Sequence, residues 1–427
     1  MKDKETFKLI NEATNTLKNN LPQGWEIKKL GEVCSLLNRG ISPKYLEAGG
    51  VCVLNQKCIR DHLISFEQSR LHDSLTKPVS PEKFIKLGDV LVNSTGNGTL
   101  GRVAQVRKIP KELVTIDSHV TIVRPKEGMF FSDFFGYMLI LIEESIKEAG
   151  EGCGGQTELA RSVLSEKFIV QYPRSIQEQK CIAAILDETF DNIAKAKVNA
   201  EQNLNNAKEL FDSYLQSVFA NNSKGWEEIK LGEIAKVVGG YSFKSTDFKK
   251  QGKYQVLRMG NVRPGYIRPN ENPVFIDYLD DKVREKALLK LNDVIITQTG
   301  TNKKRDYGFT VIIEKENYLL NQRIAVIRFP SSLLPKFFLY FSWTNLFKDQ
   351  FFANETGTVG QGNVGITAIT DAKIPFPKLA QQLTIVHKLE ELSNDCKKLE
   401  SIYQKKVIAL DELKKSILQK AFSGQLS

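Results

Sequence analysis

Two stretches of the chain each carry one narrow apolar stripe, in which apolar or small residues recur at steps of three and four. In the first stretch, Ile176 to Phe219, the stripe consists of Leu186, Phe190, Ile193, Ala200, Leu204, Ala207, Phe211, Tyr214 and Val218. In the second stretch, Leu379 to Phe422, it consists of Leu389, Leu392, Cys396, Leu399, Tyr403, Leu410, Leu413 and Ile417. Lys197 interrupts the first stripe and Lys406 the second. This heptad pattern predicts two long helices that pack antiparallel on each other.

The segments before the two helices repeat each other. Gly24 to Val33 (GWEIKKLGEV) and Gly225 to Ile234 (GWEEIKLGEI) are identical at seven of ten positions, at an offset of 201 residues. The further matching pairs are Phe84 to Val92 with Leu288 to Ile296, Thr95-Gly96 with Thr299-Gly300, Asp117 to Arg124 with Asn321 to Arg328, and Tyr172-Pro173 with Phe376-Pro377. A nearly constant offset over this length indicates duplication of a complete unit.

Each unit is expected to hold a globular domain and a helix. Short runs of alternating polarity, such as Val51–Leu54 and Val120–Arg124, predict strands, and glycine-containing turns such as Asn38-Arg39-Gly40 separate them. Helices are predicted at Asp133–Ile146 and near Pro335–Lys348. The expected fold is mixed α/β, with two globular α/β domains separated by a long antiparallel coiled coil. The expected limits are an N-terminal helix over 1–22, globular domains over 23–176 and 224–378, and helical spacers over 177–223 and 379–427.

Composition and charge limit the class of protein. The chain has 427 residues, 41% of them hydrophobic and 26% charged, without an apolar run long enough to span a membrane or the apolar core of a signal peptide. Six scattered cysteines fit a reducing cytoplasm better than a disulfide framework. A net charge of +10 and a pI near 9.1 favour a polyanionic partner, although basic proteins without one are common.

Motifs for catalysis or metal binding are weak. There is no phosphate-binding Gly-Lys-Ser/Thr loop, and Asn272 to Phe275 only loosely resembles a methyltransferase motif. The acidic cluster at Asp277 to Lys282 is more typical of a solvated turn than of a nuclease site. Cys52, Cys58, His62 and His72 lack metal-ligand spacing and have no counterpart in the other unit. We therefore expect neither a catalytic residue nor a metal site.

Amide-bearing and basic residues gather in the turns that recur in both units. Arginine, asparagine and glutamine can bridge two atoms of a base edge, and lysines and exposed backbone amides suit phosphates. Surface loops contain the same residue types for other reasons, but here the loops recur in place while their sequences differ. The candidate DNA-binding residues are Asn38, Arg39, Gln56, Lys57, Ser94, Thr95, Asn97, Arg102, His119, Gln156, Tyr241, Lys244, Arg258, Asn261, Arg263, Gln298, Thr299, Asn302, Lys303, Lys304, Arg305, Arg323, Gln361 and Asn363.

The ordered set of motifs resembles the specificity (S) subunits of type I restriction–modification systems, over nearly the whole chain. The markers are Gly24-Trp25 with Leu30-Gly31-Glu32, their copies in the second unit, Leu87 to Leu91, the helix entry Pro173 with Gln177-Glu178-Gln179, and the closing Gln419 to Leu426. Two positions depart from the pattern. Asn292 replaces Gly88, and Gln381-Gln382-Leu383 replaces Gln-Glu-Gln, which bears only on local turns and on helix entry.

The resemblance implies a non-catalytic subunit of a bacterial or archaeal cytoplasm that reads a bipartite double-stranded DNA target, one half-site per target-recognition domain. It implies methyltransferase (M) subunits, two of them, docked on the helices, and nuclease–translocase (R) subunits in the larger complex. It places S-adenosylmethionine, ATP and magnesium on those partners and no cofactor on this chain. The helices would act as a spacer. Each would be roughly 58 Å long, because about 39 helical residues rise about 1.5 Å each.

Three alternatives stay open from the sequence. The closest is an S-type subunit of a type IIB or methylation-only system, which a neighbouring reading frame with both methyltransferase and nuclease motifs would favour. A coiled-coil scaffold that binds proteins would be retained on heparin without selecting a DNA sequence. A self-sufficient nuclease would cleave DNA alone with magnesium.

Overall fold

In the computed structural model the chain divides into two compact units, and each is described by itself. The structure describes residues 21–109, 113–153, 156–222, 225–302, 304–357 and 360–426. Unit 1 holds the described residues up to Ala200 together with those from Lys405 onward, and unit 2 holds Glu201 to Gln404. The N-terminal helix expected over 1–22 lies almost wholly outside the described residues.

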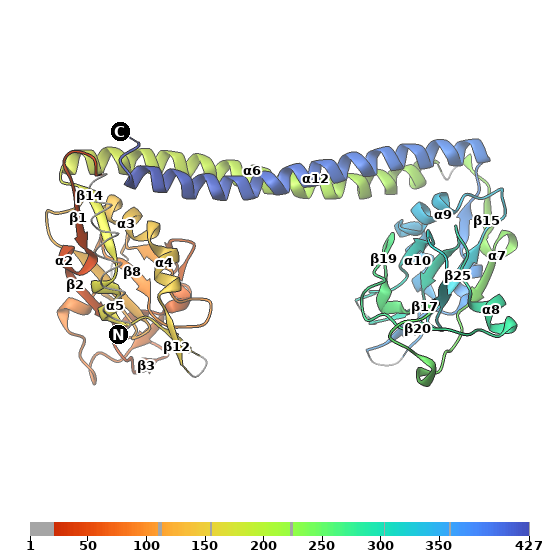
Figure 1. Ribbon diagram of the computed structural model, residues 1–427, viewed down its shortest axis with the longest axis horizontal. Helices are drawn as coiled ribbons and strands as arrows, with labels where there is room; N and C mark the ends of the chain where they lie inside the picture. The colour runs from red at the N-terminus through yellow and green to blue at the C-terminus, as the bar shows by residue number, and fades with distance from the viewer. Residues whose placement is uncertain are drawn as a thin grey trace. The chain divides into compact units, whose positions relative to one another are not determined.

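Unit 1 is rich in short strands, and the two long helices contribute to both units (Figure 1). Its elements are β1 (Trp25–Lys29), α2 (Leu30–Val33), β2 (Cys34–Arg39), β3 (Tyr45–Leu46), β4 (Val51–Leu54), β5 (Ile59–Arg60), β6 (Leu63–Ile64), β7 (Arg70–His72), β8 (Val90–Asn93), β9 (Val103–Gln105), β10 (Val114–Ile116), β11 (Val120–Pro125), α3 (Ser132–Leu141), α4 (Glu143–Glu148), β12 (Glu151–Cys153), β13 (Gln156–Glu158), α5 (Arg161–Glu166) and β14 (Ile169–Pro173), with 3-10 turns η1 (Gln56–Cys58) and η2 (Pro81–Lys83). The long helices are α6 (Ile176–Asn222) and α12 (Leu379–Phe422).

Unit 2 repeats this order with local differences. Its elements are β15 (Glu228–Lys230), α7 (Leu231–Ile234), β16 (Lys236–Gly239), η4 (Ser245–Asp247), β17 (Tyr254–Leu257), η5 (Met259–Asn261), β18 (Val262–Arg263), β19 (Tyr266–Ile267), β20 (Phe275–Ile276), α8 (Asp281–Ala287), β21 (Val294–Thr297), β22 (Thr299–Gly300), β23 (Thr310–Ile312), β24 (Tyr318–Leu320), β25 (Ile324–Arg328), α9 (Pro335–Ser342), α10 (Asn345–Ala353), β26 (Gly362–Asn363), α11 (Ile366–Thr370) and β27 (Lys373–Pro375).

The sheets show the duplication directly. A four-stranded antiparallel sheet has the order β2-β11-β8-β9 in unit 1 and β16-β25-β21-β23 in unit 2. A second sheet follows each, β10-β4-β7-β3 and β20-β17-β24, and each contains one parallel pair. Strand β1 pairs with β14 and β15 with β27, so each domain closes where its chain enters and leaves. The predicted mixed α/β fold with an internal repeat is confirmed.

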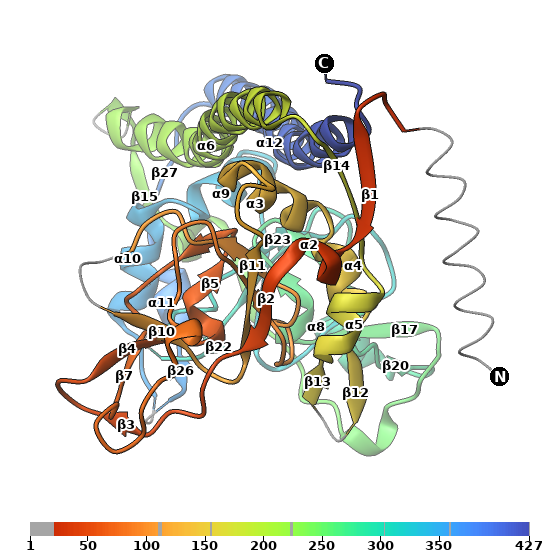
Figure 2. The same ribbon diagram turned by 90° about the vertical axis from the view of Figure 1, so that its left-hand side faces the viewer.

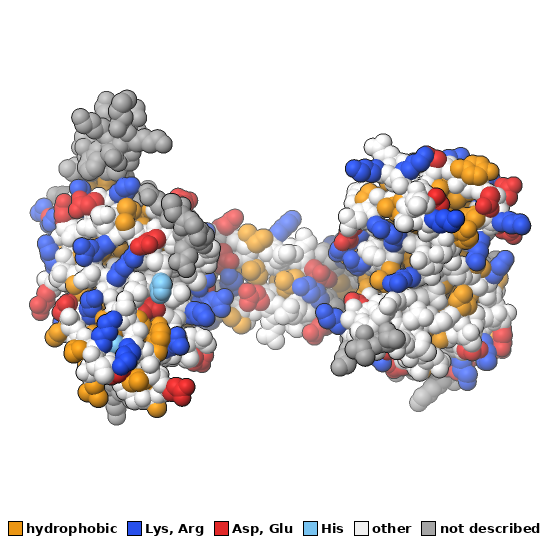
Figure 3. Space-filling view, turned by 90° about the horizontal axis from the view of Figure 1, so that it is seen from below, with side chains coloured by type: hydrophobic (Ala, Val, Ile, Leu, Met, Phe, Trp, Pro, Cys, Tyr) orange, Lys and Arg blue, Asp and Glu red, His pale blue; other side chains and the backbone are white. Residues whose placement is uncertain are grey.

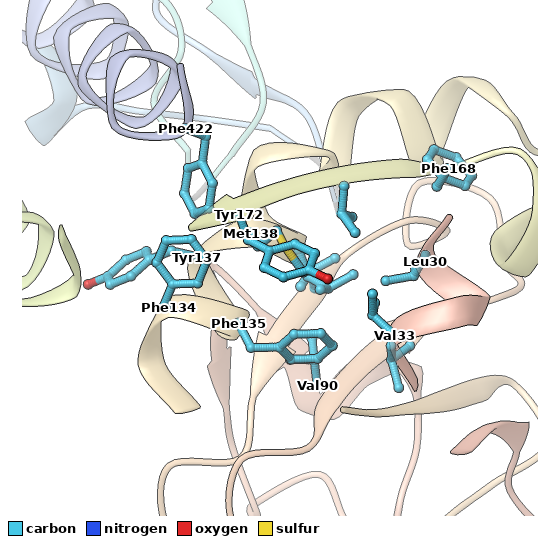
Figure 4. Close-up of a cluster of buried hydrophobic side chains, with 14 of the residues drawn as sticks. Leu30, Val33, Val90, Phe134, Phe135, Tyr137, Met138, Phe168, Tyr172 and Phe422 are labelled. Carbon is cyan, nitrogen blue, oxygen red and sulfur yellow. The ribbon is translucent and has the colours of Figure 1, made fainter. Parts of the chain in front are cut away.

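The long helices complete the core of each unit. In unit 1, helix α3 lies between the main sheet and the ends of α6 and α12 (Figures 1 and 2). Phe422 of α12 packs against Phe134 of α3 with ring centroids 4.9 Å apart, and Figure 4 shows both rings in the apolar cluster. In unit 2, Phe219 at the end of α6 occupies the corresponding place, 5.4 Å from Phe337. The apolar faces of the domains are therefore covered by helix ends.

Within each unit the long helices run antiparallel, as predicted. In unit 1 the Lys414 ammonium lies 5.0 Å from the centre of the Phe190 ring, and Lys197, which interrupts the stripe, pairs with Asp411 at 2.7 Å. The predicted seam is wrong at three positions, because Tyr214, Leu399 and Leu413 are exposed. Near the helix ends, Leu215 and Leu418 are buried in the domain cores.

Three local predictions are wrong. The single helix expected at Asp133–Ile146 is broken at Ile142 into α3 and α4, and no side chain caps the start of α3. The helix expected near Pro335–Lys348 is broken in the same way, and Thr344 caps the second part, α10. Asn38 and Arg39 are not turn residues, because both belong to β2 and pair with β11.

Candidate DNA interface

The candidate turns of unit 1 meet in one rim, defined by the segments around 56–60, 94–102, 117–119 and 156–159. The Ser94 N–H donates to the His119 carbonyl at 2.8 Å, and the Leu159 N–H donates to the Ser94 carbonyl at 2.9 Å. Gly96 N–H donates to Thr157, and the Asn93 amide donates to the carbonyl of Gln56 at 3.0 Å. Segments far apart in sequence are thus tied by backbone hydrogen bonds into one surface. Strand β12 extends from this end of unit 1, away from the long helices (Figure 1).

The side chains of this rim differ in their exposure to solvent and in the contacts they make within the protein. Lys57 is exposed and Gln56 half-buried. Arg39 donates to the Leu159 carbonyl at 2.8 Å and pairs with Glu158 at 2.7 Å. Arg102 donates to the Gly98 carbonyl at 2.9 Å. Such contacts hold a guanidinium in place but use part of its donor set.

A histidine lies at the tip of the turn between β10 and β11. His119 Nδ1 lies 2.6 Å from the Thr95 hydroxyl, and the His119 N–H donates to the buried carboxylate of Asp117 at 2.9 Å. Burial raises the pKa of Asp117, and the hydrogen bond from His119 opposes that shift. The histidine ring is therefore held through its Nδ1, and the residue is half-buried.

Unit 2 forms the equivalent rim from the segments around 241, 258–263, 298–306, 321–323 and 355–364. The Gln298 N–H donates to the Arg323 carbonyl at 3.0 Å, and the Val364 N–H donates to the Gln298 carbonyl at 2.8 Å. These two bonds match the pair that Ser94 makes in unit 1. Thr299 donates to the Asn363 side chain at 2.8 Å. The backbone frame of the two rims is therefore the same, although the side chains are not.

Several candidates of the two rims serve the protein's own loops. Asn261 is buried and donates to the carbonyls of Arg268 and Glu271, at 3.1 and 2.8 Å. Gln298 is buried and donates to Val364 at 3.1 Å, and Ser94 is buried against Thr121. That these three contact DNA stays a prediction, and their burial weighs against it.

The remaining candidates are distributed as follows. Arg258 donates to the Asn272 carbonyl, and Arg263 donates to the Gly260 carbonyl at 2.9 Å. Arg305 lies over the Phe352 ring at 4.8 Å, beside Glu355. Asn97 and Asn302 each have a partner within the protein. Lys303 and the side chain of Gln156 lie outside the described residues. The exposed side chains are Lys244, Lys304, Arg305, Arg323, Gln361 and Asn363, with Tyr241 half-buried.

The rim surface is basic but mixed. Figure 3 shows lysine and arginine side chains spread among neutral side chains on the face of each unit away from the long helices, with some acidic groups between them. Among the described residues, no group of three or more histidine, cysteine or acidic side chains is placed to hold a metal ion. His72 is buried, accepts a hydrogen bond from Lys44 N–H at 3.0 Å and lies 2.9 Å from the Lys77 carbonyl.

Sequence reasoning missed Arg60. It is exposed in β5, where it occupies the position of Arg263 in β18. The signal was present, because Gln56 to Ile64 (QKCIRDHLI) and Met259 to Ile267 (MGNVRPGYI) align at an offset of 203 residues.

Comparison with known proteins assigns the class. The family model of the type I restriction modification DNA specificity domain matches residues 22–205 and 223–409, so the chain belongs to this family. It is 23% identical over 425 residues to the MjaVIII specificity subunit of Methanocaldococcus jannaschii, covering 95% of this chain and 94% of that protein. It is 22% identical over 441 residues to the EcoKI specificity subunit of Escherichia coli K12, covering 95% and 90%. The prediction of a specificity subunit, which is not itself an enzyme, is confirmed by this membership.

Solved structures share the fold. A chain from a structure described as the basis of complex assembly and conformational transition of the type I R-M system matches with a TM-score of 0.73 at 16% identity, covering 95% of this chain and 99% of that one. The HsdS subunit of Thermoanaerobacter tengcongensis matches with a TM-score of 0.63 at 17% identity, covering 95% and 98%. In the described part of the chain, no helix is long and apolar enough to cross a membrane.

Proposed function

We propose that this chain reads a bipartite double-stranded DNA target within a type I restriction–modification complex, one half-site per unit. The observation that carries the proposal is the pair of rims, in which one backbone frame presents different side chains. The turn that follows β10 ends in Ser118-His119, and the turn that follows β24 ends in Gln322-Arg323. Two copies of one scaffold with different exposed groups suit two half-sites of different sequence.

The proposed protein partners are two methyltransferase subunits docked on α6 and α12, with nuclease–translocase subunits joining the larger complex. The long helices still expose large apolar side chains after packing on each other. In unit 1 these include Val198 (60% exposed) and Ile408 (55%), and in unit 2 Leu210 (47%) and Ile402 (57%). Exposed apolar groups on a helix favour protein contacts.

The chemistry of the complex belongs to these partners in the proposal. They would hold S-adenosylmethionine, ATP and magnesium, and the methyltransferase subunits would extrude the target adenine from the duplex. In this proposal the role of this chain is to select the DNA sequence.

Exchange of one globular domain tests the proposal. Replacing residues 24–176 with the corresponding segment of another family member should change one half of the methylated sequence and leave the other half intact, because each rim belongs to one unit. The methylated sequence is read by sequencing modified adenines in cells that carry the chain with its methyltransferase subunits. The reciprocal exchange of 225–378 is the matched control and should change the other half. A change in both halves, or in neither, would contradict one reader per unit.

A further inference from the structure

The turn Asn321–Arg323, between β24 and β25, is clamped from several sides. The Gln298 N–H donates to the Arg323 carbonyl at 3.0 Å, and the Gly240 N–H donates to the Ile324 carbonyl at 2.9 Å. Gly240 lies so close that a Cβ there would be 1.9 Å from the carbonyl oxygen of Asn321. The backbone that carries Arg323 is therefore held at the centre of the rim, and side-chain substitutions at Arg323 leave these clamps in place.

Arg323 differs from every other arginine of unit 2. The sequence of this unit holds seven arginines, at 258, 263, 268, 284, 305, 323 and 328. Six of them contact a carboxylate, a backbone carbonyl or an aromatic ring. The Arg323 side chain is exposed, and among the described residues it has no hydrogen bond, ion pair or ring contact. Its five N–H donors are thus left for a partner outside the protein.

We infer that Arg323 reads a guanine in the major groove of the half-site bound by unit 2, an inference that rests on the proposed function. A guanidinium donates two parallel hydrogen bonds to the O6 and N7 of guanine, and no other base presents two acceptors there. Because the backbone is already fixed, only the side-chain rotamers of Arg323 have to be ordered on binding. A phosphate contact would need no such fixed position, because phosphates recur along the duplex whatever the sequence.

The equivalent position of unit 1 carries different chemistry. His119 lies in the equivalent turn, and its Nδ1 lies 2.6 Å from the Thr95 hydroxyl, so at most one ring nitrogen remains for a base. A single nitrogen cannot make the bidentate contact of an arginine. The guanine contact is accordingly assigned to unit 2 alone.

The test uses the full chain produced with its own methyltransferase subunits in cells that lack other adenine methylation. Modified adenines are mapped for the wild type and for Arg323→Ala, and methylation rates are compared on duplexes that differ at single positions. The variant should accept any base at one position that the wild type requires to be guanine, with discrimination there reduced about 10- to 100-fold. That position should lie in the half that changes when residues 225–378 are exchanged. Thermal unfolding of the variant should match the wild type, since the Arg323 side chain makes no hydrogen bond, ion pair or ring contact with the described residues and its backbone contact is kept.

Arg60→Ala is the matched control, since the Arg60 side chain is also exposed and without a partner among the described residues but belongs to unit 1. It should leave the half-site of unit 2 unchanged. The inference is overturned if Arg323→Ala lowers methylation of all sequences alike, if the relaxed position is not guanine, or if Arg60→Ala relaxes the same position. A wild-type chain that directs no bipartite methylation would instead overturn the proposed function on which the inference rests.

Discussion

A buried carboxylate pairs with a half-buried arginine in each unit. Arg124 donates two hydrogen bonds of 2.7 Å to Asp89, and Arg328 pairs with Asp293 at 2.9 Å. Each aspartate also accepts the backbone N–H of a residue three positions earlier. The residue before each aspartate, Gly88 or Asn292, has a left-handed backbone with φ of +87° or +68°. Because asparagine adopts this conformation more readily than most residues, the Gly88-to-Asn292 difference leaves the turn intact.

Glu26 makes the stability of unit 1 depend on pH. Hydrogen bonds from Lys28, Tyr172 and Arg174 lower the pKa of Glu26 from 4.5 to about 2. A carboxylate whose pKa falls on folding stabilises the native state above its unfolded pKa, and the contribution is lost as protons bind. We therefore expect the difference in unfolding free energy between the wild type and Glu26→Gln to be constant above about pH 5 and to shrink between about pH 4.5 and 2. Urea denaturation at a series of pH values measures it.

Glu227 provides the control for this prediction. It is the equivalent glutamate of the second Gly-Trp-Glu motif, but Phe376 replaces Tyr172 and supplies no hydroxyl. Glu227 is exposed and has no side-chain hydrogen bond to another described residue. The pH dependence of the difference should be larger for Glu26→Gln than for Glu227→Gln. Equal pH dependence in both variants would show that the Glu26 network has no such effect.

At this scale the sequence predicts residue types and not their surroundings. Asn261 lies in the 3-10 turn η5 and Gln298 between β21 and β22, and that either side chain contacts DNA stays a prediction. Gln298 is buried where it donates to the carbonyl of Val364, in a loop distant in sequence. A local sequence pattern does not indicate such a contact. Arg60 could have been found by extending the repeat to the 3-10 turn. That the Arg323 side chain has no partner depends on the positions of distant segments, which the sequence does not give.

A buried glutamine fixes the start of each long helix against its domain. Gln179 accepts the Phe131 N–H at 2.7 Å and donates to the Pro173 carbonyl at 2.8 Å. Gln382 accepts the Leu334 N–H at 2.9 Å and donates to Pro377 at 2.9 Å. The spacing from proline to glutamine is one residue shorter in unit 2. The apparent loss of the Gln-Glu-Gln entry is therefore a shift of one position, and the functional glutamine is retained.

Gln382→Ala should destabilise unit 2 strongly. The change leaves the Leu334 N–H and the carbonyls of Ser332 and Pro377 without their partner in a buried site. Loss of a partner for buried polar groups costs about 2–3 kcal/mol. Gln404→Ala, on the exposed surface of the same helix, should cost less than about 0.5 kcal/mol. Denaturant titration of both variants measures the difference, and equal values would argue against an anchoring role.

Elements with a long or repeated pattern were predictable, and their interruptions were not. The heptads predicted α6 and α12, since a stripe sustained over many turns has few other interpretations. The breaks at Ile142 and Trp343 were missed because Asp133–Ile146 and Pro335–Lys348 each read as one continuous helix. Tyr214 and Leu413 are exposed although the heptad pattern places them in the seam, a departure that local periodicity does not record.

On the scale of the whole molecule, each unit takes helix segments from both repeats. The core of unit 1 includes Leu186 from α6 and Leu418 from α12, and the core of unit 2 includes Leu215 and Leu389. Duplication of a domain followed by a helix predicts this sharing, because each helix leaves one domain and ends on the other. We propose that the helices thereby set the separation of the two half-sites that are read.

Deleting one heptad from both helices tests this role as a spacer. Lys197 pairs with Asp411, so residues 201–207 of α6 and 401–407 of α12 are matched in antiparallel register. Their removal shortens each helix by about 10 Å and turns it by only about 20° relative to the heptad stripe, which keeps the apolar seam. The unread gap between half-sites should shorten by about three base pairs, at 3.4 Å per pair. Insertion of one heptad at the same places is the control and should lengthen the gap. Mapping of modified adenines gives both gaps, and an unchanged gap would mean that the helices serve only as a docking surface for the methyltransferase subunits.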